Sequence, residues 1–185
     1  LALFEDVVFI PWDAQKIQKL YRKTSEEVTT EFSFDEMVTL PKINGIEEAY
    51  LGIIKFEEYE KIITDENGNM QNIFYDNVRD YLGENPVNKK IDQTLKDGKF
   101  DIFSILNNGI TIVADKKNSS KGKLFSISNY QVVNGCQTSH TLFNNKELEG
   151  MGKITIPVKL IITQNEDIKS NITIATNSQT EIKEE

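Results

Sequence analysis

The sequence predicts a folded protein of the α/β or α+β class, in which helices combine with a mixed sheet. Apolar residues make up 38% of the 185 residues and charged residues 27%, a balance typical of a folded domain with a sizeable core. Segments that alternate apolar and polar side chains are interleaved with segments that space apolar side chains as a helix does. This interleaving excludes an all-helical or an all-strand architecture.

Short elements separated by acidic stretches are predicted for the first half. Residues 3–10 have the composition of a strand, and Asp13 can cap a helix whose Ile17, Leu20 and Tyr21 share one face. Beyond them the pattern predicts a strand at 36–40, a turn at 44–45, a strand at 49–54, a helix at 56–63 and a loop at 65–69.

The second half is denser in strands. Asn85 can cap a helix that begins with Pro86, and Gly98 suits the left-handed conformation that ends it. Apolar residues alternate with others through 153–163, which predicts a long strand. The remaining elements are strands at 109–114, 124–127 and 130–133, a polar loop between the first two of these, and helices at 136–144 and 167–175.

Acidic residues outnumber basic ones, and the net charge is −8. A protein that binds long stretches of nucleic acid usually carries a basic surface. The acids are concentrated in the first half of the chain, where a solvated surface is the simplest interpretation. Any contact with nucleic acid is therefore expected to be local, or to involve other parts of a longer protein.

The absence of membrane and disulfide signals predicts a cytoplasmic protein with no membrane association. No apolar run approaches the ~20 residues of a membrane-spanning helix. Glu5 and Asp6 interrupt the apolar segment near the N-terminus, unlike the core of a signal peptide. Cys136 is the sole cysteine, which excludes an internal disulfide and disfavours a zinc site built on cysteines.

The domain organisation predicted from the sequence has two parts. Residues 1–48 are interpreted as the end of a preceding region and residues 49–185 as a core domain, with which the first part can also pack as one unit. The chain begins at Leu1 rather than Met and ends shortly after a polar motif. We therefore expect it to belong to a longer protein whose other domains are its partners.

Four polar clusters are the candidates for a functional site, and each lies near the end of a predicted element, where binding residues are common. A strand that turns through Asn134-Gly135 into a helix presents backbone N–H groups that favour a phosphate or carboxylate. Gly135 allows close approach of a ligand, while Gln137 and Thr138 can recognise polar ligand edges. The clusters are 77–83, with Arg79 beside Asp80, then 107–109, 134–138 and 176–180.

A structural role is the alternative for every cluster. Asn-Gly is a common turn, and Asn and Thr often cap helices. Arg79 can hold an anion through two hydrogen bonds, or it can form an ion pair with Asp80. The residues alone leave both interpretations open.

Familiar catalytic patterns are mostly missing from the sequence. It has no glycine-rich phosphate loop, and His140 as the sole histidine excludes a site with several histidines. Cys136 and His140 are four residues apart, so they could act as nucleophile and base on one helix face; a buried cysteine and a surface histidine are the alternative. Asp65 and Glu66 could bind a divalent ion, but they lack the spacing of a calcium loop.

The clusters together resemble the AIPR family, the abortive-infection phage-resistance proteins of prokaryotes. The resemblance covers residues 45–182 and implies a role in defence against phage, often alongside restriction-modification genes, but no settled reaction. The family pattern has Gln or Cys at position 136, which lowers the case for Cys136 as an essential nucleophile. The motifs are Asn77-Val78-Arg79-Asp80-Tyr81-Leu82-Gly83, Leu106-Asn107-Asn108-Gly109-Ile110-Thr111-Ile112, Val133-Asn134-Gly135-Cys136-Gln137-Thr138 and Thr176-Asn177-Ser178-Gln179-Thr180.

A second, distant likeness concerns the turn between strand and helix. The strand, Asn-Gly, Gln and helix arrangement is similar to the Asp-Gly-Gln-His-Arg motif of ParB-like and sulfiredoxin-like proteins. Thr138 and Ser139 stand here in place of the basic pair. This likeness implies at most a related fold.

The leading hypothesis is a module that binds a nucleotide or nucleic acid in one polar cleft. A phosphodiester- or nucleotide-hydrolysing enzyme is one alternative; Asp80 and Asp115 are then the only acids near the motifs, and a divalent metal is expected only in that case. A scaffold without a ligand site is the other, and no other cofactor is predicted. The predicted ligand-binding residues are Arg79, Asn107, Asn108, Asn134, Gln137, Thr138, Asn177 and Gln179.

Overall fold

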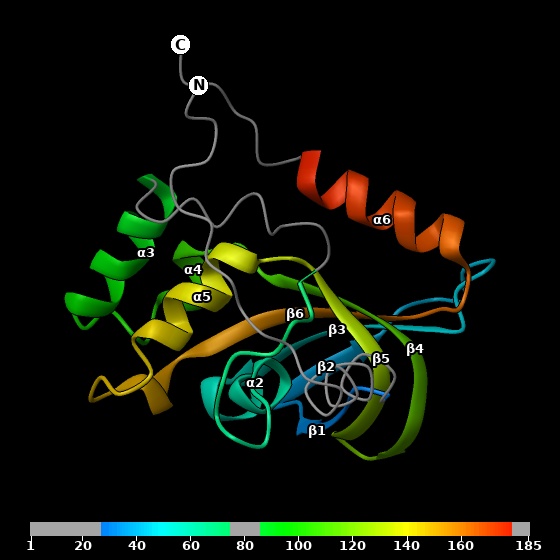
Figure 1. The fold of residues 1–185 in the computed structure, drawn as a ribbon, viewed down its shortest axis with the longest axis horizontal. Helices are drawn as coiled ribbons and strands as arrows, with labels where there is room; N and C mark the ends of the chain where they lie inside the picture. Colours follow the sequence, from blue (N-terminus) through cyan, green and yellow to red (C-terminus); the bar gives the residue numbers. More distant parts are fainter. Residues whose placement is uncertain (1–26, 75–85, 179–185) are drawn as a thin grey trace, which may run out of the picture.

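A computed structural model of the protein describes residues 27–74 and 86–178 (Figure 1). Within these ranges six strands form one mixed sheet, and five α helices pack against it, which confirms the α+β class. No helix in these ranges is long and apolar enough to cross a membrane. The strands are β1 (Thr29–Ser33), β2 (Glu36–Thr39), β3 (Glu48–Lys55), β4 (Ile110–Lys121), β5 (Leu124–Asn134) and β6 (Thr155–Ile162). The helices are α2 (Phe56–Ile63), α3 (Pro86–Lys96), α4 (Phe103–Leu106), α5 (Cys136–Asn144) and α6 (Glu166–Ser178).

The strands lie in the order β1-β5-β4-β6-β3-β2. Only β4 and β6 are parallel neighbours; the other neighbouring pairs are antiparallel. This parallel pair occupies the centre of the sheet, and the run from Ile110 to Ala114 is buried throughout. Burial on both faces explains why the central strands are nearly continuous in apolar residues.

The two outermost strands of the sheet follow one another directly in the sequence. Only Phe34 and Asp35 separate β1, which pairs with β5, from β2, which pairs with β3. The backbone N–H of Phe34 donates to the carbonyl oxygen of Lys123 at 2.9 Å, and that of Asp35 donates to Ile53 at 2.8 Å. The sheet therefore curls until one bent segment joins its two edges, as in a barrel.

Aromatic side chains pack where the two edges meet. The rings of Phe34 and Phe125 have centroids 5.2 Å apart at an angle of 83°, and those of Tyr50 and Phe125 are 4.9 Å apart at 80°. These are the edge-to-face arrangements that aromatic pairs favour. The backbone of Gly52 approaches closely, since a Cβ on it would lie 2.4 Å from Cδ1 of Phe34.

Helix α2 covers the outer side of β1. The backbone N–H of Ser33 donates to a carboxylate oxygen of Glu58 at 2.7 Å, and the hydroxyl of Thr30 donates to the carbonyl oxygen of Lys61 at 3.0 Å. Uncovered strand edges invite pairing with other chains. The helix therefore accepts hydrogen bonds from a backbone group and a side-chain group of β1 at this edge of the sheet.

The two faces of the sheet are covered unequally (Figure 1). Helices α2, α3, α4 and α5 contribute side chains to the main core, which includes Tyr59, Leu142 and Ile112. Because side chains alternate along a strand, Val113 points the other way, into a smaller cluster against which Ile172 of α6 packs. Helix α6 is therefore the main described element on that second face.

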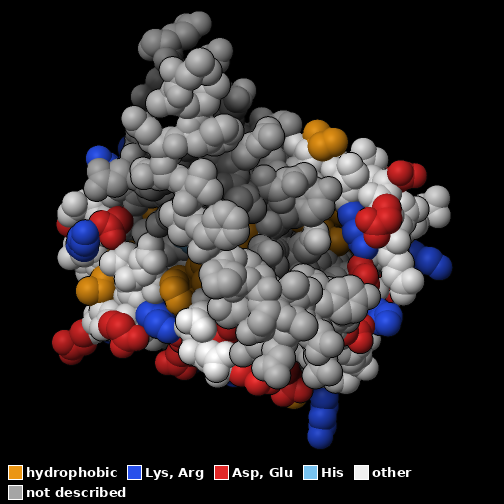
Figure 2. Space-filling view, viewed as in Figure 1, with side chains coloured by type: hydrophobic (Ala, Val, Ile, Leu, Met, Phe, Trp, Pro, Cys, Tyr) orange, Lys and Arg blue, Asp and Glu red, His pale blue; other side chains and the backbone are white. Residues whose placement is uncertain are grey.

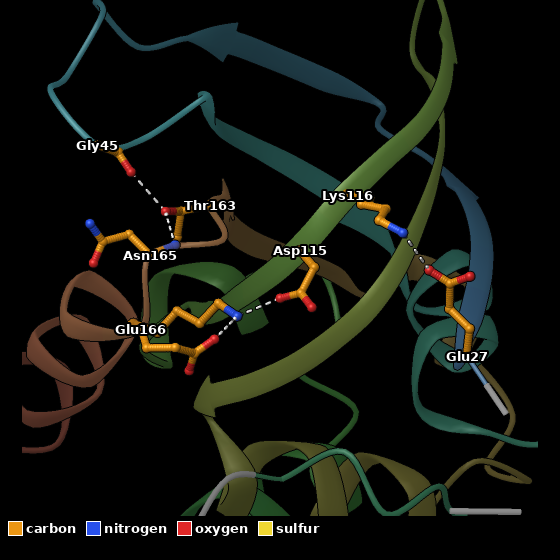
Figure 3. Close-up of polar contacts among 8 residues, drawn as sticks. Glu27, Gly45, Asp115, Lys116, Thr163, Asn165 and Glu166 are labelled. Carbon is orange, nitrogen blue, oxygen red and sulfur yellow. Dashed lines mark hydrogen bonds and ion pairs between the residues drawn. The ribbon is translucent and has the colours of Figure 1, made fainter. Parts of the chain in front are cut away.

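The start of α6 is fixed by its capping residues (Figure 3). The side-chain oxygen of Asn165 accepts from the backbone N–H of Ile168 at 3.1 Å, as an N-cap residue does. The hydroxyl of Thr163 donates to the carbonyl oxygen of Gly45 at 2.7 Å and accepts from the N–H of Asn165 at 3.1 Å. The helix is thereby tied to the turn that precedes β3.

Several predicted elements differ from the structure. The polar residues between 114 and 124 are not a loop, because β4 extends to Lys121 and only a short turn precedes β5. The strands predicted at 124–127 and 130–133 are one strand, and the short strand β1 and helix α4 were not predicted. Predicted elements at 3–10 and after Asp13 lie outside the described residues.

Candidate functional site

The pairing of β4 with β5 brings two of the polar clusters together. Thr111 at the start of β4 lies opposite Asn134 at the end of β5. The cluster 107–109 precedes β4, and the cluster 134–138 begins where β5 ends. Because the strands are antiparallel, these two segments meet at the same end of the sheet.

Gly135 makes the turn from β5 into α5. Its φ is 102°, in the left-handed region that favours glycine, and it occupies the N-cap position of the helix. A Cβ on Gly135 would lie 2.3 Å from Cδ1 of Ile110. The conformation therefore favours glycine between the strand and the helix, and a larger residue would also have to displace the end of the Ile110 side chain.

Asn134 joins a third cluster to the first two. Its side-chain N–H donates to the carbonyl oxygen of Thr176 at 2.8 Å. Thr176 lies in α6, two residues before Ser178, the last residue of the helix that the structure describes. The motif that begins at Thr176 is thus held beside the end of β5, and Asn177 is exposed there.

The two asparagines before β4 differ in role. The side-chain N–H of Asn107 donates to the carbonyl oxygen of Phe103 at 3.0 Å and closes the short helix α4. Asn108 is exposed. Gly109 packs closely on β6, since a Cβ there would lie 2.8 Å from the carbonyl oxygen of Pro157. Asn108 is therefore the exposed member of this cluster.

The predicted site residues fall into three groups by exposure. Asn108 and Asn177 are exposed, while Thr138 is buried with 7% of its surface exposed. The half-buried group consists of Asn107, Asn134 and Gln137. Arg79 and Gln179, like Asp80, lie outside the described residues.

A buried pair of hydroxyl groups between α2 and α5 was not predicted from the sequence. The hydroxyl oxygens of Tyr59 on α2 and Ser139 on α5 are 2.5 Å apart, and the Ser139 hydroxyl donates to the carbonyl oxygen of Gly135 at 2.7 Å. Burial raises the pKa of Tyr59 above its usual value, so the phenol stays protonated. Tyr59 was predicted only as part of an apolar helix face, because its partner lies 80 positions away in the sequence.

The environment of Cys136 and His140 is unfavourable for a nucleophile and its base. Cys136 is buried with 5% of its surface exposed, and burial among apolar groups disfavours the reactive thiolate. His140 is half-buried, and its ring centroid is 5.2 Å from that of Phe74. Burial lowers the pKa of His140, so the imidazole is mostly neutral at pH 7.

Asp115 holds α6 against the sheet (Figure 3). The ammonium group of Lys169 on α6 bridges the carboxylates of Asp115 on β4 and Glu166 in its own helix. Burial alone would lower the pKa of Lys169, but the hydrogen bonds to the two carboxylates raise it. One of the two acids available to a hydrolytic mechanism is therefore engaged in an ion pair.

Acidic groups do not gather into a metal site in the part of the chain that the structure describes. The carboxylate of Asp65, which the sequence offered as a cation ligand, accepts hydrogen bonds from the backbone N–H groups of Asn67 and Asn69, both at 2.9 Å. These bonds close the loop between α2 and the following segment. Figure 2 shows acidic and basic side chains interspersed over the described surface in view.

The chain was compared with known protein families. The model of the AIPR family, described as AIPR protein, matches residues 74–185, which is more than half of the chain. The match starts later than residue 45, where the resemblance of motifs was expected to begin, and it includes all four clusters. No curated protein and no solved structure matches the chain significantly. The order of the motifs and the extent of the match lead to the same conclusion: this chain belongs to the AIPR family.

Proposed function

We propose that this chain is the ligand-binding module of a phage-resistance protein, and that it binds a nucleotide, free or at the end of a nucleic-acid strand. Membership in the AIPR family associates the chain with phage resistance by abortive infection. The observation that carries the binding proposal is the meeting of three polar clusters at one end of the sheet. The hydrogen bond from Asn134 to Thr176 and the contact of Gly135 with Ile110 bring them together.

The exposed amide side chains are suited to recognise the base of the ligand. An amide side chain offers both donors and an acceptor, which suits the hydrogen-bonding edges of a nucleobase. Asn108 and Asn177 are exposed on segments that flank the end of β5. We assign them to direct contact with the ligand, and Gln137 to contact at the margin of the site.

The start of α5 supplies the environment for an anion. The first backbone N–H groups of a helix attract phosphate, and the helix dipole adds to the attraction. Arg79 and Gln179 belong to the motifs that complete the same family pattern, and we assign Arg79 to charge neutralisation of the phosphate. In this arrangement the first turn of α5 binds the phosphate of the ligand, and the exposed amides bind its base.

The charge of the chain favours a small ligand or a strand end over a long tract. A net charge of −8 opposes an extended phosphate backbone, whereas a local site needs to neutralise few charges. On the one face that Figure 2 shows, the described acidic and basic side chains are interspersed. We therefore expect binding that depends little on the length of the nucleic acid.

Binding titrations with ATP, a short single-stranded DNA and the same DNA as a duplex test the proposal. We expect binding of ATP or of the single strand, and a loss of about tenfold in affinity in Asn108→Ala and in Asn177→Ala, the effect of removing one or two ligand hydrogen bonds. Asn67→Ala is the matched control, because Asn67 is an exposed asparagine outside the clusters. Equal affinity in all three variants, or no binding of any probe, contradicts the proposal.

A scaffold is the second candidate, favoured by the bonds that Asn107 and Asn134 make. Both side chains donate to backbone carbonyl oxygens, as structural asparagines do. In that case Asn134→Ala lowers the melting temperature, while Asn108→Ala and Asn177→Ala change neither stability nor the binding of any probe.

A further inference from the structure

Tyr59 and Ser139 form a chain of hydrogen bonds that ends on the turn of the proposed site. Both side chains are completely buried, and their hydroxyl oxygens are 2.5 Å apart. The Ser139 hydroxyl lies 2.7 Å from the carbonyl oxygen of Gly135, which can only accept. The two bonds thus link α2 through the core to the residue at the N-cap of α5.

The direction of this chain is fixed by the number of hydrogens. A serine hydroxyl carries one hydrogen, and that of Ser139 is donated to Gly135. Tyr59 must therefore donate to Ser139, and the serine oxygen accepts. The carbonyl oxygen of Gly135 also accepts the backbone N–H of Ser139 at 2.9 Å, so two donors hold it in one orientation.

We propose that Tyr59 is a positioning residue of the polar site, which acts through Ser139 to hold the Asn134–Gly135 turn in the geometry that aims the first turn of α5 and the Asn134 amide. The effect on binding rests on the proposed function, whereas the effect on the turn does not. Without the Tyr59 hydroxyl, the buried Ser139 oxygen loses its donor, and rotation of the serine side chain releases Gly135. Burial raises the pKa of Tyr59, which keeps the donated proton in place across the neutral range.

The proposed functional unit extends beyond the motifs. Tyr59 lies on α2, outside residues 74–185 that the family model matches. Its contact is nevertheless with the cluster at 134–138 in that region. The segment before residue 74 therefore contributes to the site through the core.

Tyr130 offers a matched control in the same core. Its hydroxyl donates to the carbonyl oxygen of Ile62 at 2.7 Å, and its side chain is 2% exposed. Tyr130→Phe and Tyr59→Phe therefore each remove one buried phenol donor and keep the ring. A role limited to stability predicts similar behaviour of the two variants.

The test compares the two variants by amide hydrogen exchange and by titration with ATP and a short single-stranded DNA. We expect similar melting temperatures, but exchange of the Ser139 N–H about tenfold faster in Tyr59→Phe than in Tyr130→Phe, since a tenfold change corresponds to about 1.4 kcal/mol. Probe binding should fall about tenfold in Tyr59→Phe alone. Equal exchange in the two variants overturns the inference, even where probe binding is intact.

Two further results separate this inference from the proposed function. If the native protein binds neither probe, the proposed function fails, and the exchange comparison still decides whether Tyr59 holds the turn. Ser139→Ala provides a second variant, because it removes the hydroxyl between Tyr59 and Gly135. Adding Tyr59→Phe to Ser139→Ala should not speed the exchange of residue 139 further, and a full additive effect would show that Tyr59 acts by another route.

Discussion

Asn134, the last residue of β5, donates its side-chain N–H to the carbonyl oxygen of Thr176 in the last turn of α6. This bond joins two motifs that are 42 positions apart in the sequence. Asn165 and Lys169 hold the other end of the helix. Helix α6 is therefore held near its start by these two residues and again at Thr176 by a residue of a different motif.

Asn134→Ala should release the last turn of α6. The half-buried Asn134–Thr176 hydrogen bond is lost, and we expect a loss of about 1–3 kcal/mol in the free energy of unfolding. Amides in the last turn of the helix should also exchange faster with solvent, as nuclear magnetic resonance can measure. Asn177→Ala, in the same turn but exposed, is the control; identical stability and exchange in the two variants would contradict the prediction.

Gly135→Ala should destabilise the protein for two separate reasons. A φ of 102° is unfavourable for alanine, and the new Cβ would meet Cδ1 of Ile110 at 2.3 Å. We expect a loss of about 2–4 kcal/mol in urea denaturation, from backbone strain and overpacking together.

Gly122→Ala isolates the backbone part of this effect. Gly122 also has a positive φ, of 63°, but a Cβ there meets nothing within 4 Å. Its loss should be about 1 kcal/mol. Adding Ile110→Val to Gly135→Ala should recover part of the difference, and a failure to recover any would show that the contact with Ile110 is not the cause.

Glu48→Gln should flatten the dependence of stability on acidic pH. Hydrogen bonds from Lys117 and then Tyr50 lower the pKa of Glu48 below its usual value of 4.5. The unfolded chain therefore binds the proton more readily than the folded protein. The stabilisation is complete above pH 4.5 and is lost as the pH falls through the lower pKa of the folded state.

Urea denaturation at a series of pH values between about 7 and 3 measures this contribution. This interval spans the usual pKa range of carboxyl groups. Glu48→Gln should lose stability at neutral pH and differ less from the native protein in acid. Glu47→Gln is the control, because Glu47 is an exposed neighbour. Parallel curves for Glu48→Gln and the native protein would exclude the predicted role of Glu48.

Gly52→Ala tests the closure of the sheet. The new Cβ would lie 2.4 Å from Cδ1 of Phe34 and 2.7 Å from the carbonyl oxygen of Glu36, where the bent segment meets β3. We expect a loss of about 1–3 kcal/mol from overpacking, measured by denaturation. Phe34→Leu should cost less in the Gly52→Ala background than in the native protein, and simple additivity would count against the close contact.

Elements with a strong apolar period were predictable from the sequence. Helix α2 has the predicted bounds, and its four apolar side chains are buried on one face as expected. Helix α5 also has the predicted bounds, and β3 and α6 extend the predictions by a few residues. These segments are predictable because the side chains that the local apolar spacing places on one face are also the ones buried in the folded protein.

The elements that were missed depend on partners far away in the sequence. Strand β1 holds only Phe32 as a large apolar residue, and pairing with β5 rather than its own composition makes it a strand. The outer half of the β4–β5 hairpin is rich in Lys, Asn and Ser and resembles a loop in sequence. Long-range pairing overrides local propensity in both cases.

The candidate site was predictable only as a set of motifs. The order of the clusters indicated the AIPR family, but not that Asn134 would donate to Thr176. The pair of Tyr59 and Ser139 had no sequence signal, because a tyrosine on an apolar face and a serine in a helix are both ordinary. Hydrogen bonds across the core follow from tertiary packing, and a single sequence does not encode them as a pattern.

The bent segment from β1 to β2 has a consequence for dividing the chain. A truncated protein that begins at residue 74, where the family match begins, would lack β1, β2, β3 and α2. The backbone N–H and C=O groups of β5 and β6 that pair with β1 and β3 would then lie on exposed edge strands, which can pair with strands of other copies. We therefore expect such a truncation to aggregate, because the stretch that carries the family motifs contains only three of the six strands of the described sheet.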